Sequence, residues 1–512
     1  MKIDKFYKET IVLSISNITM GLFRFVFSII LSKKLGSEGL GLYSIILPIY
    51  DLFCCLSCGG LVSAISSKGA EFVTKGNNHN LIKTVRVAAI FDFIWSLIIA
   101  LLMFFNSSAI SIYILKDLRS IASLRMISIA IIFISLSNVL KGYFLSLSKA
   151  SIPAFIDIFE KVVRISMVLL TFNIIKVVDI PTAVTLVFFA LCIGEGFSLL
   201  MLFVFYKITR KKVIIDYSLS TESMPQLLMQ VLIIAVPLAL NGFLSSILGT
   251  ASTLILPRRL VSSGIPYETA LSLIGEFSGM AVSIILFPSV IISAISTIIV
   301  PEISGALATK DFFKVEKRIG DVIRVSLYLG LATLIICSII PKELGILFFN
   351  KPSIFKYIFT AALSCPLYFM LYTTYGVMSG IGKQKDILLN SLIISILDII
   401  ILYIFGGISW INIYAYAITL FLTSLVGVIL NIISIRSFTK IRFGKYQIIS
   451  TCIISILTIL IVAILKNLLV NLSCFTKTFI IIFVSFSSMI LGGIKIDRLF
   501  GWYKTIKKEV SH

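Results

Sequence analysis

The chain repeats one pattern along its length, in which an apolar run long enough to cross a lipid bilayer is followed by a short polar segment. A bilayer core needs roughly 20 apolar residues in a helix, and backbone groups inside it must be satisfied within the segment. The pattern predicts an all-α polytopic membrane protein with about 14 transmembrane helices. The runs fall at residues 10–31, 42–66, 85–105, 122–147, 152–175, 183–206, 228–250, 276–300, 320–341, 354–381, 386–407, 409–435, 447–465 and 477–494.

Composition agrees with this class of protein. Of the 512 residues, 58% are hydrophobic and 13% are charged, whereas a soluble domain carries about 25% charged residues. The net charge of +21 does not indicate nucleic-acid binding, because no basic face interleaved with aromatic residues lies outside the apolar runs.

The Lys and Arg residues predict the orientation. If every run crosses and the N-terminus is cytoplasmic, 28 of the 45 lie in or beside cytoplasmic segments and 13 lie in or beside the opposite loops. Basic residues favour the cytoplasmic side, and the strongest signals are the segments at 206–212 and 435–445. We therefore expect a multi-pass protein of the cell membrane with both termini cytoplasmic.

The sequence lacks the residues that several kinds of catalysis require. Only two histidines occur, His79 and His512, so histidine metal sites and Ser-His or Cys-His catalysis are not expected. No GxxxxGK[ST] segment is present, which argues against an internal ATPase. The Cys55/Cys58 spacing lies inside an apolar run and is interpreted as helix packing. The sequence predicts no enzyme, no cofactor and no metal.

The two halves of the chain resemble each other. GYFLSLSK at 142–149 corresponds to GVMSGIGK at 376–383, and further weak matches occur in the same order. We predict two pseudo-symmetric six-helix lobes and a final helix pair, as in transporters that bind substrate between repeats. The predicted divisions are 1–206 for the N-terminal lobe, 207–227 for a cytoplasmic linker, 228–436 for the C-terminal lobe and 437–512 for the last two helices with a cytoplasmic tail.

Arg24 is a permanent positive charge inside the first apolar run. A charge at mid-membrane costs a few kcal/mol unless it faces a cavity or a partner. The guanidinium fork matches phosphate well, so one interpretation is a cavity residue that contacts an anion. The alternative is a structural ion pair with a carboxylate on another helix, for which Asp51 is an option.

The fifth run carries a charged group in FIDIFEKVVRI, residues 155–165. Asp157 and Lys161 are four residues apart, as are Glu160 and Arg164, so both pairs can form on neighbouring faces of one helix. The group is either a cavity wall or a structural ladder.

Other charges in or near apolar runs are single residues. Asp51 follows Pro48, where a broken helix would open a polar pocket, and we place it in the substrate cavity. Further candidates for coupling or gating are Asp92, Glu276, Arg324 and Asp398. Glu276 and Arg324 also fit an interfacial location.

Two stretches carry a family resemblance. LGSEGLGLYSIILPIYDLFCCLSCGGLVSAISSKGAEF at 35–72 and EFSGMAVSIILFPSVIISAISTIIVPEISGA at 276–306 resemble the second-helix and eighth-helix signatures of the stage V sporulation protein B and polysaccharide exporter family. That family belongs to the multidrug/oligosaccharidyl-lipid/polysaccharide (MOP) exporter superfamily. The Glu160/Arg164 pair also fits it.

The resemblance implies fourteen helices in two lobes around a central cavity, and alternating access that flips a lipid-linked saccharide. The related lipid II flippases carry an Arg-x-x-Gly-x-x-Arg pattern in the first helix. Gly21 and Arg24 match its second half, whereas Ile18 stands at the first Arg position.

We therefore predict a flippase for a lipid-linked peptidoglycan or polysaccharide precursor, with a role in spore cortex formation as one option. A cation-coupled multidrug antiporter of the same superfamily is the alternative, although the first run has Arg24 and no acid. The expected partners are a lipid-linked pyrophosphate saccharide and membrane lipids, with H⁺ or Na⁺ as candidate coupling ions and a monomer as the expected state. A membrane scaffold would gain nothing from intramembrane charges.

Overall fold

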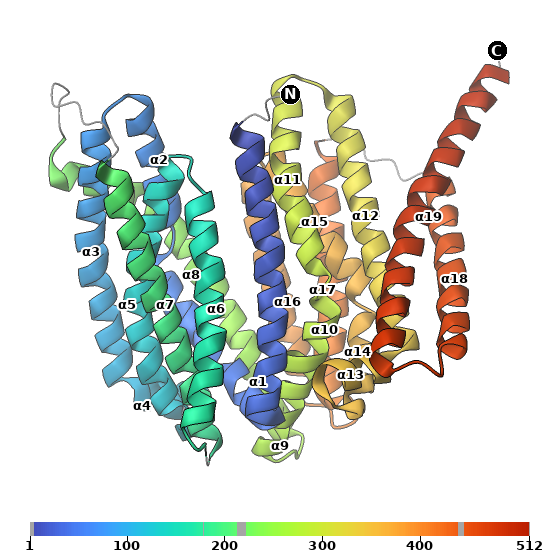
Figure 1. Ribbon diagram of the computed structural model, residues 1–512, viewed down its shortest axis with the longest axis horizontal. Helices are drawn as coiled ribbons and strands as arrows, with labels where there is room; N and C mark the ends of the chain where they lie inside the picture. Colours follow the sequence, from blue (N-terminus) through green and yellow to red (C-terminus); the bar gives the residue numbers. More distant parts are fainter. Residues whose placement is uncertain (1–4, 178, 212–221, 439–444, 511–512) are drawn as a thin grey trace. The chain divides into compact units, whose positions relative to one another are not determined.

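The structure is a computed structural model that describes residues 5–177, 179–211, 222–438 and 445–510 (Figure 1). This part of the chain is helical and contains no strand, which confirms the all-α prediction. Parts of the predicted linker 207–227 and of the basic segment 435–445 lie outside the described residues.

The chain divides into two compact units, residues 1–261 with 265–275 and residues 262–264 with 276–512. The repeat boundaries at 206 and 228 stay a prediction. Unit 1 contains α1 (Lys5–Cys58), α2 (Leu61–Thr74), α3 (Asn78–Phe105), α4 (Ser107–Ala109), η1 (Ile110–Leu115), η2 (Leu118–Ser120), α5 (Ile121–Ser146), α6 (Ser151–Ile174), α7 (Ile180–Lys211), α8 (Met224–Ser262) and α9 (Tyr267–Ile274).

Unit 2 contains most of η3 (Gly275–Ala281), followed by α10 (Val282–Leu286), α11 (Ser289–Ala308), α12 (Phe312–Ile339), α13 (Pro341–Phe349), η4 (Pro352–Ile354), α14 (Phe355–Ala362), α15 (Cys365–Gly380), α16 (Gln384–Phe405), η5 (Asn412–Tyr414), α17 (Ala415–Arg436), α18 (Lys445–Leu468) and α19 (Cys474–Val510). Within it, α15 packs against α11, α12 and α17, and α18 lies beside α19.

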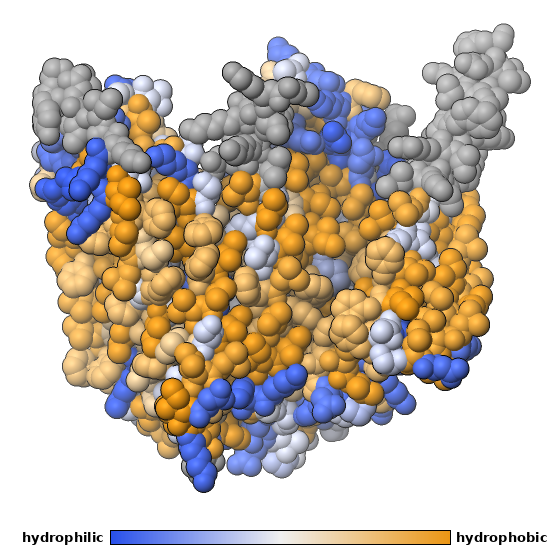
Figure 2. Space-filling model, in the orientation of Figure 1, coloured by the Kyte–Doolittle hydropathy of each residue, from blue (hydrophilic) through white to orange (hydrophobic). Residues whose placement is uncertain are grey.

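Twelve helical segments of the described chain are long and apolar enough to cross a membrane, and one bent pair, 352–362 with 365–380, would add another. One of the twelve, Val12–Thr74, contains two predicted runs, separated at Gly36 where φ is +69°. Figure 2 shows apolar side chains over the middle of the helices and hydrophilic ones near their ends. The surface thus has the character expected for contact with lipid.

The break in the second predicted run does not lie at Pro48. The α1 helix continues through Pro48 to Cys58, and a two-residue turn at Gly59 and Gly60 separates it from α2. The Pro48 carbonyl accepts a hydrogen bond from Thr250 Oγ1 at 3.2 Å, so α8 contacts α1 at this point. Gly60 has φ +75°, a conformation that glycine adopts without strain.

The apolar core of unit 1 lies where α2, α3, α5 and α7 meet. Its largest fully buried side chains include Tyr143 and Phe144 of α5 and Ile65 of α2. Because α5 packs against α2, α3 and α7 at once, it holds the helices that carry the charged residues described next.

Candidate functional site

Six charged side chains of unit 1 form ion pairs close to one another. Four of them come from α6, and α5 and α7 supply one each. The residues at 160–164 lie near the middle of α6, which spans Ser151–Ile174. We call this set the charged cluster: Lys141, Asp157, Glu160, Lys161, Arg164 and Glu195.

Arg164 is the centre of the charged cluster. Its Nη2 lies 2.6 Å from Glu160 Oε1 and 2.9 Å from Glu195 Oε1. Lys161 Nζ lies 2.5 Å from Glu160 Oε2. A guanidinium between two carboxylates is a charge-assisted arrangement that fixes the position of both helices.

The second predicted pair of α6 does not form. The Asp157 carboxylate contacts Lys141 Nζ on α5 at 2.8 Å, while Lys161 contacts Glu160. The Glu160/Arg164 pair forms as its spacing predicts. The cluster thus links α6 to both neighbouring helices, which a ladder on one helix would not do.

The centre of the charged cluster is buried. The side chains of Glu160, Glu195 and Arg164 are 4%, 9% and 13% exposed. A Cβ at Gly194 would come within 2.7 Å of Glu160 Oε1, so this glycine lets α7 approach the carboxylate closely. Three acids balance three bases, and this balance offsets the cost of burying each charge.

Arg164 Nε and Ser198 Oγ are among the buried polar atoms at this site that have no hydrogen-bond partner among the residues that the structure describes. Ser198 lies one turn beyond Glu195 on α7. Arg164 also interacts electrostatically with Tyr43 and Tyr50 of α1. Buried polar groups are normally paired, so these two atoms indicate a place for a polar ligand or water.

Arg24 lies level with the charged cluster. Ser16 Oγ of α1 donates to the Ala154 carbonyl of α6 at 3.4 Å, and Lys34 Nζ lies 5.7 Å from the centre of the Phe172 ring. Both contacts join residues 138 positions apart, so α1 and α6 run parallel in a constant register. The same offset places Arg24 beside the charged turn of α6.

The Arg24 side chain is exposed on unit 1, and none of its contacts within the described chain is a hydrogen bond or an ion pair. The alternative of a structural pair with Asp51 is therefore not formed. Asp51 is also exposed, and it interacts electrostatically with Tyr43 and Cys54 on its own helix.

Asp92 differs from the other candidates because its side chain is fully buried on α3. Ser135 Oγ of α5 lies 2.7 Å from both carboxylate oxygens of Asp92, and Ser57 Oγ lies 3.1 Å from Ser135 Oγ. No ion pair of Asp92 occurs among the described residues. A buried carboxyl group held by one hydroxyl is a candidate for binding H⁺ or Na⁺.

The remaining candidates belong to unit 2. Glu276 contacts Lys351 Nζ at 2.7 Å, and Arg324 lies 3.7 Å from Asp321. Asp398 interacts electrostatically with Tyr416. The structure does not bring these three residues into one cluster.

Lys141 and Glu195 complete the charged cluster, but neither is among the site residues predicted from the sequence. Lys141 and Glu195 join the cluster because α5 and α7 pack beside α6. The spacing of residues within one helix does not predict which helices pack together. The available signal was a lysine near the end of one apolar run and a glutamate in the middle of another.

The arrangement suits the binding of a polar or charged group. No group of three His, Cys, Asp or Glu residues in the described part of the chain lies close enough to hold a metal ion. The buried acids Glu160 and Glu195 are tied to cations and are not free to exchange protons with a substrate.

Comparisons with known proteins place this geometry in context. A family model described as polysaccharide biosynthesis protein matches residues 6–307. Stage V sporulation protein B of Bacillus subtilis (strain 168) is 26% identical over 389 residues, which cover 76% of this chain and 75% of that protein. Sporulation protein YkvU of the same strain is 22% identical over 408 residues, covering 79% of this chain and 89% of that protein.

Solved structures with the same fold include two kinds of transporter. Lipid II flippase MurJ in its inward closed conformation gives a TM-score of 0.69 at 16% identity and covers 97% of this chain and 99% of that one. An inward-facing multidrug resistance MATE family transporter of the MOP superfamily gives a TM-score of 0.64 at 16% identity, over 83% and 98% of the two chains.

Proposed function

The chain belongs to the polysaccharide biosynthesis protein family, and from this premise we propose that it flips a lipid-linked saccharide across the cell membrane by alternating access. The two relatives are named as sporulation proteins, which supports a role in sporulation, and the cargo that we propose for that role is a peptidoglycan precursor of the spore cortex. The similarity to a lipid II flippase supports the same class of cargo.

The observation that carries the proposal is Arg24, an exposed guanidinium level with the charged cluster in unit 1. The cluster contains three acids and three bases and leaves Arg24 as additional positive charge beside it. A pyrophosphate group carries negative charge that must exchange its water for protein donors during transport. Arg24 supplies those donors, and Arg164 Nε and Ser198 Oγ offer further polar atoms to the saccharide.

Arg24→Ala tests this role in vesicles that contain purified protein and a fluorescent lipid-pyrophosphate-saccharide. We expect the variant to insert and fold normally and to lose flipping, because the anion loses its guanidinium partner. Lys33→Ala removes an exposed positive charge from the same helix and serves as the matched control. Normal flipping by Arg24→Ala would remove this residue from the site.

The antiporter alternative has one observation in its favour, the similarity to MATE family transporters. It predicts export of a cationic dye by the same vesicles and no flipping of the saccharide lipid. The absence of an acid from the first apolar run favours the flippase.

We further propose that Asp92 is the coupling group for H⁺ or Na⁺. Its buried carboxyl group contacts the Ser135 hydroxyl and no cation within the described chain. Asp92→Asn keeps the shape and is expected to abolish any acceleration of flipping by an imposed H⁺ or Na⁺ gradient. Asp179→Asn, an exposed site, is the control, and a gradient effect that survives in Asp92→Asn would exclude the role.

A further inference from the structure

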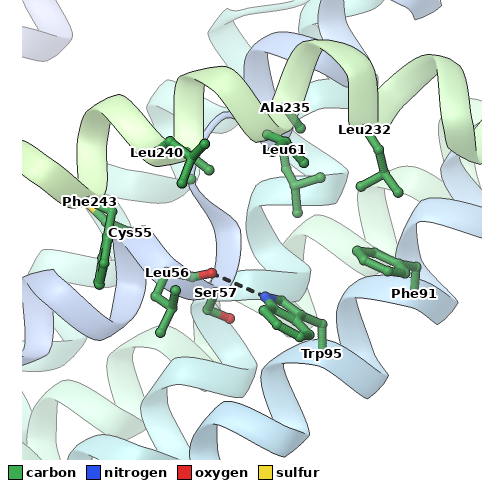
Figure 3. A pocket seen from close by; sticks show the side chains of 13 residues that line it. Cys55, Leu56, Ser57, Leu61, Phe91, Trp95, Leu232, Ala235, Leu240 and Phe243 are labelled. Atoms are coloured by element: carbon green, nitrogen blue, oxygen red, sulfur yellow. Dashed lines mark hydrogen bonds between the residues drawn. The ribbon is translucent and has the colours of Figure 1, made fainter.

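An apolar pocket of about 350 Å³ lies in unit 1 where α1 ends and α2 begins (Figure 3). Its side chains come from the last turn of α1, the first residue of α2, the middle of α3 and the middle of α8. None of the lining residues is charged. The lining includes aromatic side chains from two facing helices, Phe91 and Trp95 of α3 and Phe243 of α8.

The polar side-chain groups that line the pocket are all engaged. Trp95 Nε1 donates to the Leu56 carbonyl at 3.1 Å, Ser57 pairs with Ser135 at 3.1 Å, and Cys55 Sγ accepts from Ser246 at 3.1 Å. Sites for drug-like molecules and sugars present a few free polar groups that orient the ligand. This pocket presents none, so its chemistry fits a hydrocarbon chain.

The pocket opens on side chains that are exposed on unit 1. Leu56, Trp95, Val236 and Leu240 are 37–58% exposed, and all four lie in segments apolar enough to cross a membrane. The hydrocarbon chain of a lipid can therefore enter the pocket from the bilayer without passing through water.

The charged cluster lies on another side of the same part of α1. Glu195 interacts electrostatically with Tyr50, Cys54 and Cys58, whereas Cys55 and its neighbours line the pocket. An α-helix is about 10–12 Å across with its side chains. The width of α1 therefore separates the charged cluster from the apolar pocket. The two sites together suit an amphiphile with an anionic head and a hydrocarbon chain.

The depth of the pocket favours the cargo lipid over bulk phospholipid. Trp95 and Leu240 lie near the middle of α3 and α8. A phospholipid keeps its head group at the interface, roughly 15 Å from the centre of a bilayer core about 30 Å thick. When the protein carries the head group of its cargo lipid across the membrane, the first part of the hydrocarbon chain reaches the middle of the bilayer, which is the depth of the pocket.

We propose that the pocket binds the hydrocarbon chain of the lipid-linked cargo near its pyrophosphate while the head group passes the charged cluster. The inference rests on the proposed function, because it takes its amphiphile from there. It adds a chain-binding site to the head-group contacts.

Photo-labelling tests the site. Protein in vesicles is irradiated with a lipid pyrophosphate whose hydrocarbon chain carries a diazirine near the pyrophosphate, and labelled peptides are identified by mass spectrometry. We expect labels on α3 around Trp95 and on α8 around Leu240, displaced by unlabelled lipid pyrophosphate. Leu240→Trp narrows the mouth and is expected to reduce labelling about tenfold, which corresponds to about 1.4 kcal/mol.

Leu244→Trp is the matched control, because Leu244 is exposed on the same helix but does not line the pocket, and its labelling should equal that of the wild type. The proposal is overturned if no label reaches the pocket. It is also overturned if a diazirine phosphatidylglycerol labels the pocket and lipid pyrophosphate does not displace it.

Flipping of the fluorescent saccharide lipid is measured separately in the same vesicles. Competed labelling without flipping would support the pocket and contradict the proposed function. Flipping without labelling in the pocket would support the function and contradict the pocket.

Discussion

The predicted repeat pairs α5, α6 and α7 of unit 1 with α15, α16 and α17 of unit 2, and the two sets of helices hold buried polar networks of different character. In unit 1, α5, α6 and α7 carry ion pairs centred on Arg164. In unit 2, Asn390 of α16 donates to Asn431 of α17 at 2.8 Å, and Asn431 donates to Thr374 of α15 at 2.9 Å. The fold therefore needs a polar contact between these helices but not a charge.

The ion pairs of unit 1 and the amide and hydroxyl contacts of unit 2 therefore call for different explanations. Amides and hydroxyls can fix helix positions in a membrane at modest cost, as unit 2 shows. Charges are far more costly in the same environment. Their presence in unit 1, level with Arg24, is therefore better explained by a charged cargo than by packing.

Removing the central cation tests this contrast most strongly. Arg164→Leu should lower the free energy of unfolding in detergent micelles by about 3–5 kcal/mol, because Glu160 and Glu195 stay buried without their cation. Asn431→Leu in unit 2 is the counterpart and should cost about 1–3 kcal/mol for the partners left unpaired. Chemical denaturation followed by far-UV circular dichroism measures both. Equal losses would contradict the contrast.

Much of the fold could be predicted from the sequence, because membrane spans depend on local composition. All fourteen runs are helical, although 42–66, 276–300 and 354–381 each cross a break between helices. The spacing of Glu160 and Arg164 gives the pair that forms. Lys141 and Glu195 were not placed in the cluster, because which helices meet α6 is decided by packing, including the close approach at Gly194. The sequence suggested a helix break at Pro48, whereas the structure has the break at Gly59 and Gly60.

A second pair of equivalent positions differs in backbone strain. The helices α5 and α15, which the predicted repeat pairs, end with the same cap, in which Lys149 N donates to Phe144 O at 3.0 Å and Lys383 N donates to Met378 O at 2.9 Å. The residue before each lysine is left-handed, Ser148 with φ +53° and Gly382 with φ +79°. Only the glycine adopts this conformation without cost.

Exchanging these two residue types should shift stability in opposite directions. Ser148→Gly should raise the unfolding free energy by about 1 kcal/mol, and Gly382→Ser should lower it by about 1–2 kcal/mol, the cost of a left-handed residue with a Cβ. Both residues are exposed, so packing changes little. Thermal unfolding of the two variants measures the effect, and shifts of the same sign would show that the caps are not equivalent.

The smallest effect is expected at the edge of the charged cluster. Lys141 and Asp157 are 21% and 31% exposed at their side chains, so their ion pair is partly screened by its surroundings. A double-mutant cycle with Lys141→Met and Asp157→Asn should give a coupling energy of about 0.5–1 kcal/mol, the range of exposed pairs. A coupling as large as the loss from Arg164→Leu would mean that the cluster acts as one unit and that its edge is as buried as its centre. A small coupling would separate a rigid centre, which positions α6 and α7, from an edge free to exchange partners as cargo passes.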